Sequence, residues 1–308
     1  MASYTFGVEI EIIAVPHTIR ANLQSLTAAY YRKIAAALKV RGLQAGSNPL
    51  TPSADGRTPA SYDKWWITRD GSLIIQPSDA ARLVAIEAVS PILSTSEDWQ
   101  REIDKFWEGF HAVFHTPTPS PLCGSHYHIS RGRNTSFTLG ELKTIAFGVV
   151  LFESQLTKIL VQQRRTNQYC TPNTASSAAL KRAVSHSVGY LAATINSVRD
   201  TTSLCRLMQA NRYVLWNFAN IVPGKSGTIE FRGGRCLRGK FRTRAWVAFT
   251  VSFIHWLLKT NHIANLDRSW DGSVSGLYAN VQNAAQQLGL NDELPPYYTN
   301  LNETTFWR

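Results

Sequence analysis

Cysteine is scarce in this sequence, and the few cysteines lie far apart. The four are Cys123, Cys170, Cys205 and Cys236. No two of them form a C-x-x-C pair, so the spacing predicts neither a zinc site nor a disulfide framework. We therefore expect free thiols.

Long uncharged hydrophobic runs are also missing. No stretch is long and apolar enough to cross a bilayer, which predicts a protein that does not span a membrane. Glu9 and Glu11 interrupt the N-terminal segment where a secretory signal needs an unbroken apolar core. The sequence thus indicates a cytoplasmic location.

Charged residues are few, and the two signs are not balanced. They make up 17% of the 308 residues against 44% for hydrophobic residues, a composition typical of folded soluble proteins. The net charge of +11 indicates anionic partners: nucleic acid, an acidic membrane surface, or small phosphates and carboxylates. Charge alone does not choose among these partners.

The length suits one domain, residues 1–308, with one extensive core. Within it, the Pro- and Gly-rich stretch 44–61 is interpreted as a mobile lid, and 263–308 as a C-terminal extension. Apolar periodicity predicts strands at 4–13, 62–68, 82–89, 123–130 and 228–232, and helices at 18–43, 94–115, 138–163, 176–198, 240–259 and 275–288. Two helices open with capping patterns, Ser94-x-x-Glu97 and Thr138-x-x-Glu141. Short strands between long helices favour an α+β fold, a curved antiparallel sheet with helices packed on one face.

Three predicted strands carry polar residues two positions apart. The pairs are Glu9 and Glu11, His126 and His128, and Glu230 and Arg232. Side chains two apart on a strand point to the same face, so each strand sends ionic groups to one side and apolar groups to the other. If the strands share one sheet, its concave face also gathers Glu87.

Carboxylates gathered in this way repel one another unless a cation neutralises them, because unit charges about 4 Å apart interact by roughly 4 kcal/mol at an effective dielectric near 20. Oxygen ligands without thiolates favour Mg²⁺, and an added imidazole makes Mn²⁺ acceptable. A solvated polar face is the alternative for each pair taken alone.

Basic residues follow Glu230 closely. They are Arg232, Arg235, Arg238, Lys240, Arg242 and Arg244. Guanidinium groups bind phosphate and carboxylate with two parallel hydrogen bonds, so this segment predicts a clamp for nucleotide phosphates, with Gly233, Gly234 and Gly239 allowing close approach. A solvated charge cluster is the alternative.

Six segments, in order, resemble the amidoligase family within the carboxylate–amine ligase superfamily, which includes glutamine synthetase and glutamate–cysteine ligase. They are FGVEIE (6–11), WWITRDGSL (65–73), EAVSPIL (87–93), CGSHYHIS (123–130), NRYVLWNF (211–218) and GTIEFRGG (227–234). The resemblance implies a glutamine-synthetase-like catalytic domain that joins a small carboxylate to an amine, using ATP and Mg²⁺ through an acyl phosphate.

The resemblance also implies roles for individual residues. Glu9 and Glu11 would ligate different metal ions, Glu87 and Asp70 would complete one metal site, and Glu230 with His126 the other. His128 would lie near the nucleotide, and Arg232 would contact the transferring phosphate; the nucleotide-binding role of Arg235 and Arg238 comes from the basic run alone. Asp70 is separated from Glu87 by a long insertion, so a turn residue is the alternative at that position.

Two further interpretations stay open around residue 212. Asn211 and Arg212 match a family motif, and Arg212 would bind a substrate carboxylate. In the alternative, Asn211 caps a turn while Tyr213, Trp216 and Phe218 belong to the core.

Three other functions compete with the ligase. One is a guanidino or other ATP-dependent phosphotransferase on the same fold, and another is a basic nucleic-acid-binding protein, disfavoured by the acidic groups on the strands. The third is a cysteine hydrolase using Cys123 with His126 or His128, disfavoured because strand neighbours at such short range rarely align. A homo-oligomer is left open.

Overall fold

The computed structural model describes residues 2–18, 23–47, 62–80, 82–267 and 271–302. The fold is α+β, as the sequence predicts. Contacts within the chain divide it into two compact units: unit 1 is Met1–Thr5, Tyr127–Gly234 and Ala245–Arg308, and unit 2 is Phe6–His126 and Arg235–Arg244. The single-domain organisation stays a prediction, and most of the predicted lid at 44–61 lies outside the described residues.

Unit 2 holds the N-terminal strands and two helices. Its elements are β1 (Thr5–Ala14), α1 (Leu23–Val40), β2 (Ala45–Ser47), β3 (Trp65–Thr68), β4 (Val84–Val89), β5 (Leu93–Ser94), α2 (Trp99–His111) and the first residues of β6 (Gly124–Ser130). The strands lie in the order β2-β3-β4-β1, and β5 also pairs with β1.

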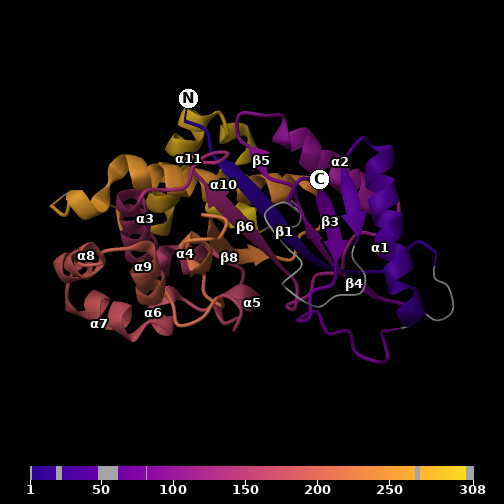
Figure 1. Cartoon of the computed structure of the whole chain (residues 1–308), viewed down its shortest axis with the longest axis horizontal. Helices are drawn as coiled ribbons and strands as arrows, with labels where there is room; N and C mark the ends of the chain where they lie inside the picture. The colour runs from indigo at the N-terminus through magenta and orange to yellow at the C-terminus, as the bar shows by residue number, and fades with distance from the viewer. Residues whose placement is uncertain (1, 19–22, 48–61, 81, 268–270, 303–308) are drawn as a thin grey trace. The chain divides into compact units, whose positions relative to one another are not determined.

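The pairing in unit 2 corrects the predicted antiparallel sheet. β4 is antiparallel to both β1 and β3, but β2 runs parallel to β3, so the sheet is mixed. β1 and β3 run in the same direction because both are antiparallel to β4. The helix α1 carries the chain back after β1, so that β2 runs in this direction too and is parallel to β3. Figure 1 shows β1, β3 and β4 side by side without the predicted curling.

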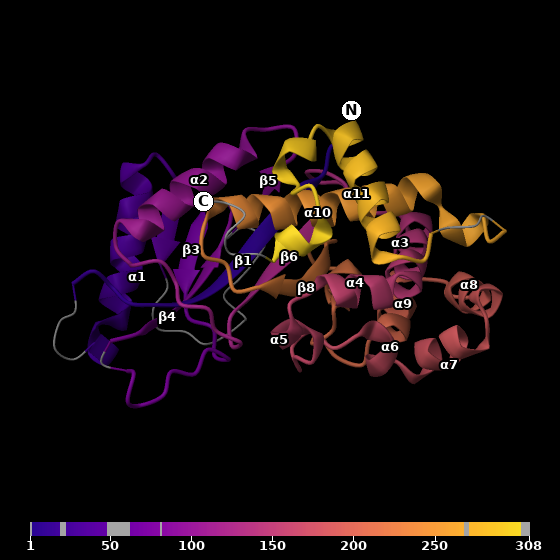
Figure 2. The same cartoon turned by 180° about the vertical axis from the view of Figure 1, so that it is seen from behind.

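Helices α1 and α2 pack together, and α1 covers β3 and β4 (Figures 1 and 2). The strand face beneath them is apolar: Phe6 packs edge-on against Trp99 of α2, and Trp65 of β3 stacks on Phe106 at 4.1 Å. Alternate residues of β1, including Glu9 and Glu11, therefore point to the opposite face.

The start of α2 differs from the predicted Ser94 cap. Asp98 is the N-cap residue, and its side chain accepts a hydrogen bond from the Arg101 N–H. Ser94 belongs to β5, and its hydroxyl bonds to that of Ser96. Asp98 directly precedes Trp99, the first apolar residue of α2, and aspartate is among the most favoured N-cap residues, so it marks the helix start better than Ser94 does.

Unit 1 holds most of the helices. Its elements are the rest of β6, α3 (Leu139–Leu151), α4 (Glu153–Ile159), α5 (Gln162–Arg165), α6 (Asn173–Ser176), α7 (Ala178–His186), α8 (Val188–Asn196), α9 (Thr201–Met208), β7 (Trp216–Asn217), η3 (Ala219–Ile221), β8 (Ile229–Arg235), α10 (Lys240–Thr260, from Ala245 on), η4 (His262–Ala264), α11 (Val274–Leu288), η5 (Asn291–Glu293) and η6 (Tyr298–Leu301). β8 lies next to β6 and pairs antiparallel with β7.

The capping box predicted at Thr138 and Glu141 is present at the start of α3. Two predicted long helices are instead broken into shorter ones. The helix expected to reach residue 163 ends at Leu151, and the helix expected at 176–198 is divided at Ser187, whose side chain caps α8. Serine competes for backbone hydrogen bonds in this way, so it favours a helix start over a helix interior.

Gly233 of β8 is required by packing. A Cβ atom there would lie 2.6 Å from the Phe231 ring, 2.7 Å from Leu215 and 2.9 Å from Leu160. Buried side chains fill the space on the Cβ side of Gly233, so packing alone accounts for a glycine there. Close approach of a ligand to this glycine stays a prediction.

Gly233→Ala is expected to lower the free energy of unfolding by about 1–3 kcal/mol, the usual cost of overpacking a core. Gly140→Ala is the matched control, because nothing lies within 4 Å of the added methyl group. Denaturant unfolding followed by circular dichroism measures both. Equal stabilities for the two variants would contradict the packing role of Gly233.

Among the described residues, no helix combines the length and the apolar character needed to cross a membrane.

Candidate functional site

Unit 2 gathers carboxylates on the sheet face opposite the one that packs against α1 and α2. Glu11 of β1 lies directly opposite Glu87 of β4, and Glu87 lies opposite Thr68 of β3. Glu9 is two residues before Glu11 and opposite Val89. The predicted grouping of Glu9, Glu11 and Glu87 is thus present on adjacent strands.

These carboxylates are poorly hydrated. Glu11 is 6% exposed and Glu87 is 4% exposed. Directly opposite residues on antiparallel strands have Cβ atoms about 4.5–5.5 Å apart, and like charges in such a pair destabilise the sheet. Two buried carboxyl groups in directly opposite strand positions are therefore candidates for a functional role.

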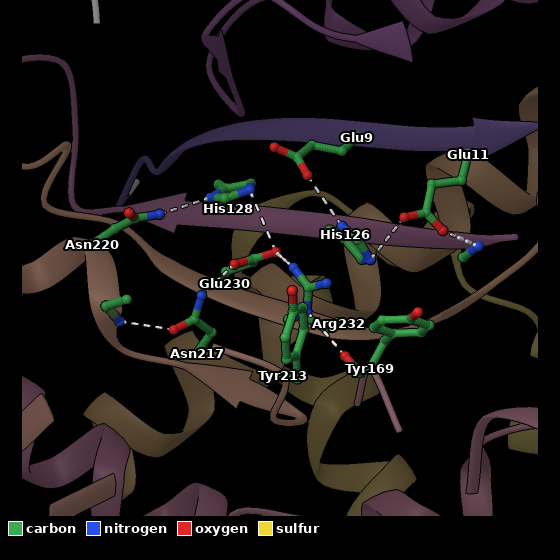
Figure 3. A network of polar contacts seen from close by, with 12 residues as sticks. Glu9, Glu11, His126, His128, Tyr169, Tyr213, Asn217, Asn220, Glu230 and Arg232 are labelled. Carbon is green, nitrogen blue, oxygen red and sulfur yellow. Dashed lines mark hydrogen bonds and ion pairs between the residues drawn. The ribbon is translucent and has the colours of Figure 1, made fainter. Parts of the chain in front are cut away.

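His126 of β6 connects two of the acids (Figure 3). Its Nδ1 lies 3.1 Å from Oε2 of Glu9, and its Nε2 lies 3.7 Å from Oε1 of Glu11. Each ring nitrogen of His126 thus has a carboxylate oxygen of its own beside it, and the contact with Glu9 is the shorter. A ring that donates from Nδ1 to Glu9 would present the Nε2 lone pair to the Glu11 side, where a cation could bind.

The backbone also holds Glu11 in place. The Gly124 N–H donates a hydrogen bond of 2.6 Å to Oε2 of Glu11. This bond leaves Oε1 directed towards His126, so the two oxygens have different partners. Glu11 is therefore held from two sides.

Beyond Glu11 and Glu87 the same sheet face becomes apolar. Ile13 lies opposite Ala85, two residues along from the acids on each strand. These two side chains belong to a small buried cluster. Its members are Ile13, Leu73, Ala85, Cys123 and Cys236. The buried cluster thus forms an apolar wall beside Glu11 and Glu87.

Asp70 occupies a turn just after β3. Its Oδ1 accepts a hydrogen bond from the Ser72 N–H, and its carbonyl oxygen accepts one from the Leu73 N–H. These bonds account for its conformation as a turn residue. Its assignment as a metal ligand stays a prediction.

Unit 1 carries a second acidic group, Glu230 of β8, which is 3% exposed. Its Oε1 accepts a hydrogen bond from the Arg232 guanidinium, and its Oε2 accepts one of 2.6 Å from the Asn217 side chain on β7 (Figure 3). Asn217 is opposite Glu230 in the strand register. Glu230 is therefore fixed at both oxygens.

Arg232 is held from more than one direction. Its Nε donates to the Tyr169 carbonyl oxygen at 3.1 Å, while its own carbonyl oxygen accepts a hydrogen bond from the buried Arg164 side chain. Its guanidinium plane is consequently restrained by both Glu230 and Tyr169.

His128 lies beside Glu230 in unit 1. Its Nε2 is 3.8 Å from Oε1 of Glu230, and its Nδ1 is 3.4 Å from the Thr228 hydroxyl. Asn220 also contacts Nδ1 at 3.5 Å. The structure brings His128, Glu230 and Arg232 together, as the shared strand face predicts.

Asn211 and Arg212 lie on an exposed turn. Asn211 Oδ1 accepts a hydrogen bond from the Tyr213 N–H, so Asn211 caps a turn. Tyr213 is 37% exposed, which corrects its placement in the core, whereas Trp216 and Phe218 are fully buried.

The Tyr213 ring packs between two neighbours. The Arg212 guanidinium lies 5.3 Å from its centroid, and the Tyr169 ring lies 5.4 Å away, edge to face. Figure 3 shows Tyr213 pointing towards the Glu230–Arg232 pair. Binding of substrate by Arg212 stays a prediction.

Part of the predicted arginine clamp has structural contacts within unit 2. Arg238 Nε donates to the Pro117 carbonyl oxygen at 2.8 Å. Lys240 and Arg244 both pair with Asp104, at 3.3 Å each. Arg235 is half-buried, and desolvation lowers the pKa of its guanidinium. A phosphate-binding role for Arg235 and Arg238 stays a prediction.

Cys123 does not have the character of a catalytic nucleophile. It is 1% exposed, and a hydrogen bond with Cys236 together with burial raises its pKa above the ordinary value. A thiol that resists ionisation attacks poorly. The cysteine hydrolase hypothesis therefore has no support from this residue.

The sequence did not predict three hydrogen bonds of the site. They join the Asn217 side chain to Glu230, the Arg232 guanidinium to the Tyr169 carbonyl oxygen, and the Gly124 N–H to Glu11. Asn217 carried a signal, since an amide in the apolar run LWNF needs a buried partner. The other two hydrogen bonds use backbone groups, which every residue type has, so the sequence gives no sign of them.

Comparison with known proteins adds a family. No curated protein matches the chain. One family model does match, over residues 2–254, a range that includes every acid and histidine described above. The chain therefore belongs to the family described as "putative amidoligase enzyme".

Proposed function

We propose that this protein is an ATP- and Mg²⁺-dependent ligase that joins a small carboxylate to an amine through an acyl phosphate. Family membership supports the formation of an amide bond. The observation that carries the metal dependence is the buried opposition of Glu11 and Glu87, with His126 beside Glu11.

The residues of unit 2 suit a divalent ion. Glu11 and Glu87 supply oxygen ligands and His126 Nε2 supplies one nitrogen, a set suited to Mg²⁺ or Mn²⁺. Metal-binding histidines usually donate their other N–H to a carboxylate, as Nδ1 of His126 does towards Glu9. Glu9 then orients His126 and adds negative charge, and Asp70 is the further candidate ligand.

In unit 1 we assign Glu230 to a second divalent ion, with His128 near the nucleotide. The Glu230 oxygens bond to Arg232 and Asn217, which hold the buried carboxylate in one orientation. Divalent ions held by these residues would neutralise negative charge on the phosphate groups of the nucleotide.

The proposed reaction has two displacements. A substrate carboxylate oxygen attacks the γ-phosphorus of ATP, the bond to the β-γ bridging oxygen breaks, and ADP leaves. The amine nitrogen then attacks the acyl carbon, phosphate leaves, and the nitrogen loses a proton. Arg232, held in one orientation by Glu230 and Tyr169, would stabilise charge on the transferring phosphoryl group.

Two finer proposals accompany this function. The α+β unit organisation is proposed to be a variant of the glutamine synthetase catalytic fold. Arg212, exposed and ordered over Tyr213, is proposed to bind the substrate carboxylate, since a guanidinium matches that group with two hydrogen bonds.

The direct test incubates the purified protein with ATP, Mg²⁺ and pooled organic acids, amino acids and amines. We expect ADP formation that requires both an acid and an amine, with a condensation product in the mass spectrum. Labelling both oxygens of the active carboxylate with ¹⁸O should place one label in the released phosphate, because the acyl oxygen leaves with phosphorus.

The alternatives give other outcomes. A phosphorylated guanidino product without condensation would favour the phosphotransferase. Release of unlabelled phosphate would exclude the acyl phosphate. Salt-dependent binding of DNA or RNA without any ADP formation would favour the nucleic-acid-binding alternative.

A further inference from the structure

Two cysteines lie together in the apolar wall beside the carboxylates of unit 2. Cys123 precedes β6, and Cys236 follows β8, more than a hundred residues later in the chain. Both sulfurs belong to the buried cluster with Ile13, Leu73 and Ala85, and the two thiols hydrogen bond to each other. A pair of small apolar residues would fill this space equally well without sulfur chemistry.

The two thiols are not equivalent. Accepting the hydrogen bond from Cys123 lowers the pKa of Cys236 below its ordinary value, and the nearby Arg235 and Arg238 act in the same direction. The same hydrogen bond raises the pKa of Cys123. Cys236 is therefore the sulfur that ionises first, and Cys123 keeps its proton.

A short covalent path connects this pair to the proposed metal site. Gly124, whose N–H bonds to Oε2 of Glu11, is joined to Cys123 by a peptide bond. A movement of Cys123 turns that peptide, and the N–H turns with it. Glu11 lies opposite Glu87, so its direction decides whether both can face one ion.

We propose that Cys123 and Cys236 are a site of reversible oxidation, closed to a disulfide by a hydroperoxide, and that closure weakens divalent metal binding at Glu11. The second part rests on the proposed function, whereas the first part does not. In this proposal the oxidation state of the two thiols in the apolar wall controls metal binding at Glu11.

The chemistry balances in two steps. The Cys236 sulfur attacks one peroxide oxygen, the O–O bond breaks, and water or an alcohol leaves with a sulfenic acid formed on Cys236. Oxidation of Cys236 removes the thiol-to-thiol hydrogen bond that raises the pKa of Cys123. The Cys123 sulfur then attacks the Cys236 sulfur, the S–O bond breaks, and the oxygen leaves as water with the Cys123 proton. Two thiols lose two electrons and two protons, and a dithiol reductant reverses the change.

The consequence for Glu11 is mechanical. A disulfide requires the sulfurs to approach to about 2.05 Å, closer than two hydrogen-bonded thiols lie. In the proposed closure the backbone at Cys123 follows its sulfur, and the Gly124 N–H moves off Glu11. Loss of a hydrogen-bonding partner of a metal ligand typically costs about 10–100-fold in metal affinity.

The experiment uses the full chain, reduced or treated with one equivalent of hydrogen peroxide. Intact mass and peptide mapping are expected to show a loss of two hydrogens confined to a Cys123–Cys236 cross-link. Calorimetric titration with Mn²⁺ should then show affinity weakened about tenfold or more, and restored by dithiothreitol.

Variants make the result specific. Cys236→Ser and Cys123→Ser should each keep Mn²⁺ affinity after peroxide, while Cys205→Ser, altered on α9, should respond like the wild type. Four free thiols after peroxide, or a cross-link with unchanged Mn²⁺ affinity, would overturn the inference. Absence of Mn²⁺ binding in the reduced protein would instead count against the proposed function, with the cross-link still readable by mass.

Discussion

Glu11→Gln is expected to remove Mn²⁺ binding from unit 2 and to lower ligase turnover by more than a hundredfold, beyond the roughly 10–100-fold cost of losing an outer partner. Glutamine keeps the shape of the side chain and an oxygen that accepts the Gly124 N–H. What it loses is the charge opposite Glu87. Titration calorimetry and ADP release measure the two effects.

The same substitution should not destabilise the metal-free protein. Removing one of two opposed like charges relieves a repulsion of roughly 0.2–1 kcal/mol, so the apparent melting temperature without metal should stay level or rise. The increase in melting temperature that Mn²⁺ gives the wild type should disappear. Together these changes separate a ligand from a residue that merely supports the fold.

Two further variants test whether the effect is specific to Glu11. Glu9→Gln should weaken Mn²⁺ binding less than Glu11→Gln, because Glu9 is proposed to orient His126. Glu108→Gln, on the exposed side of α2, should leave affinity and turnover unchanged. Wild-type Mn²⁺ affinity in Glu11→Gln would refute the ligand assignment.

The acidic face of unit 2 was predictable because it depends on strand periodicity. Residues two apart on a strand must share a face, so Glu9 and Glu11 point together wherever the strand lies. The register that sets Glu11 opposite Glu87 was not predictable, since it depends on where β4 begins. The prediction placed that start at residue 82, and it lies at Val84.

Helix ends were harder to predict because serine and aspartate near them compete for the same role. Ser94 and Asp98 both precede the apolar stripe of α2, and Asp98 is the cap. Ser187 divides what apolar periodicity presents as one helix. These local choices moved boundaries without changing the fold class.

The roles of the basic residues after Glu230 depend on partners distant in sequence. Arg238 bonds to Pro117, and Lys240 and Arg244 pair with Asp104. The sequence of an arginine run is the same whether its side chains bind phosphate or form hydrogen bonds and ion pairs within the protein. Arg232 of this run does bond to a residue of the predicted site, Glu230, two residues before it in the chain.

Arg232→Lys is therefore expected to lower ligase turnover by about a thousandfold or more, the lower range for arginines that stabilise a transferring phosphoryl group. An ammonium group carries its three N–H donors on one nitrogen. It does not reproduce the two separate, coplanar positions from which Nη1 and Nε of the guanidinium bond Glu230 and the Tyr169 carbonyl oxygen. The positive charge remains, but its orientation is lost.

The kinetic pattern distinguishes this role from a structural one. If Arg232 acts on the transferring group, kcat should fall far more than the KM for ATP rises, because the interaction strengthens in the transition state. Arg206→Lys, on the exposed side of α9, is the matched control and should behave as the wild type. A lysine variant with near-normal kcat would show that charge suffices and that the restraint by Glu230 and Tyr169 has no catalytic purpose.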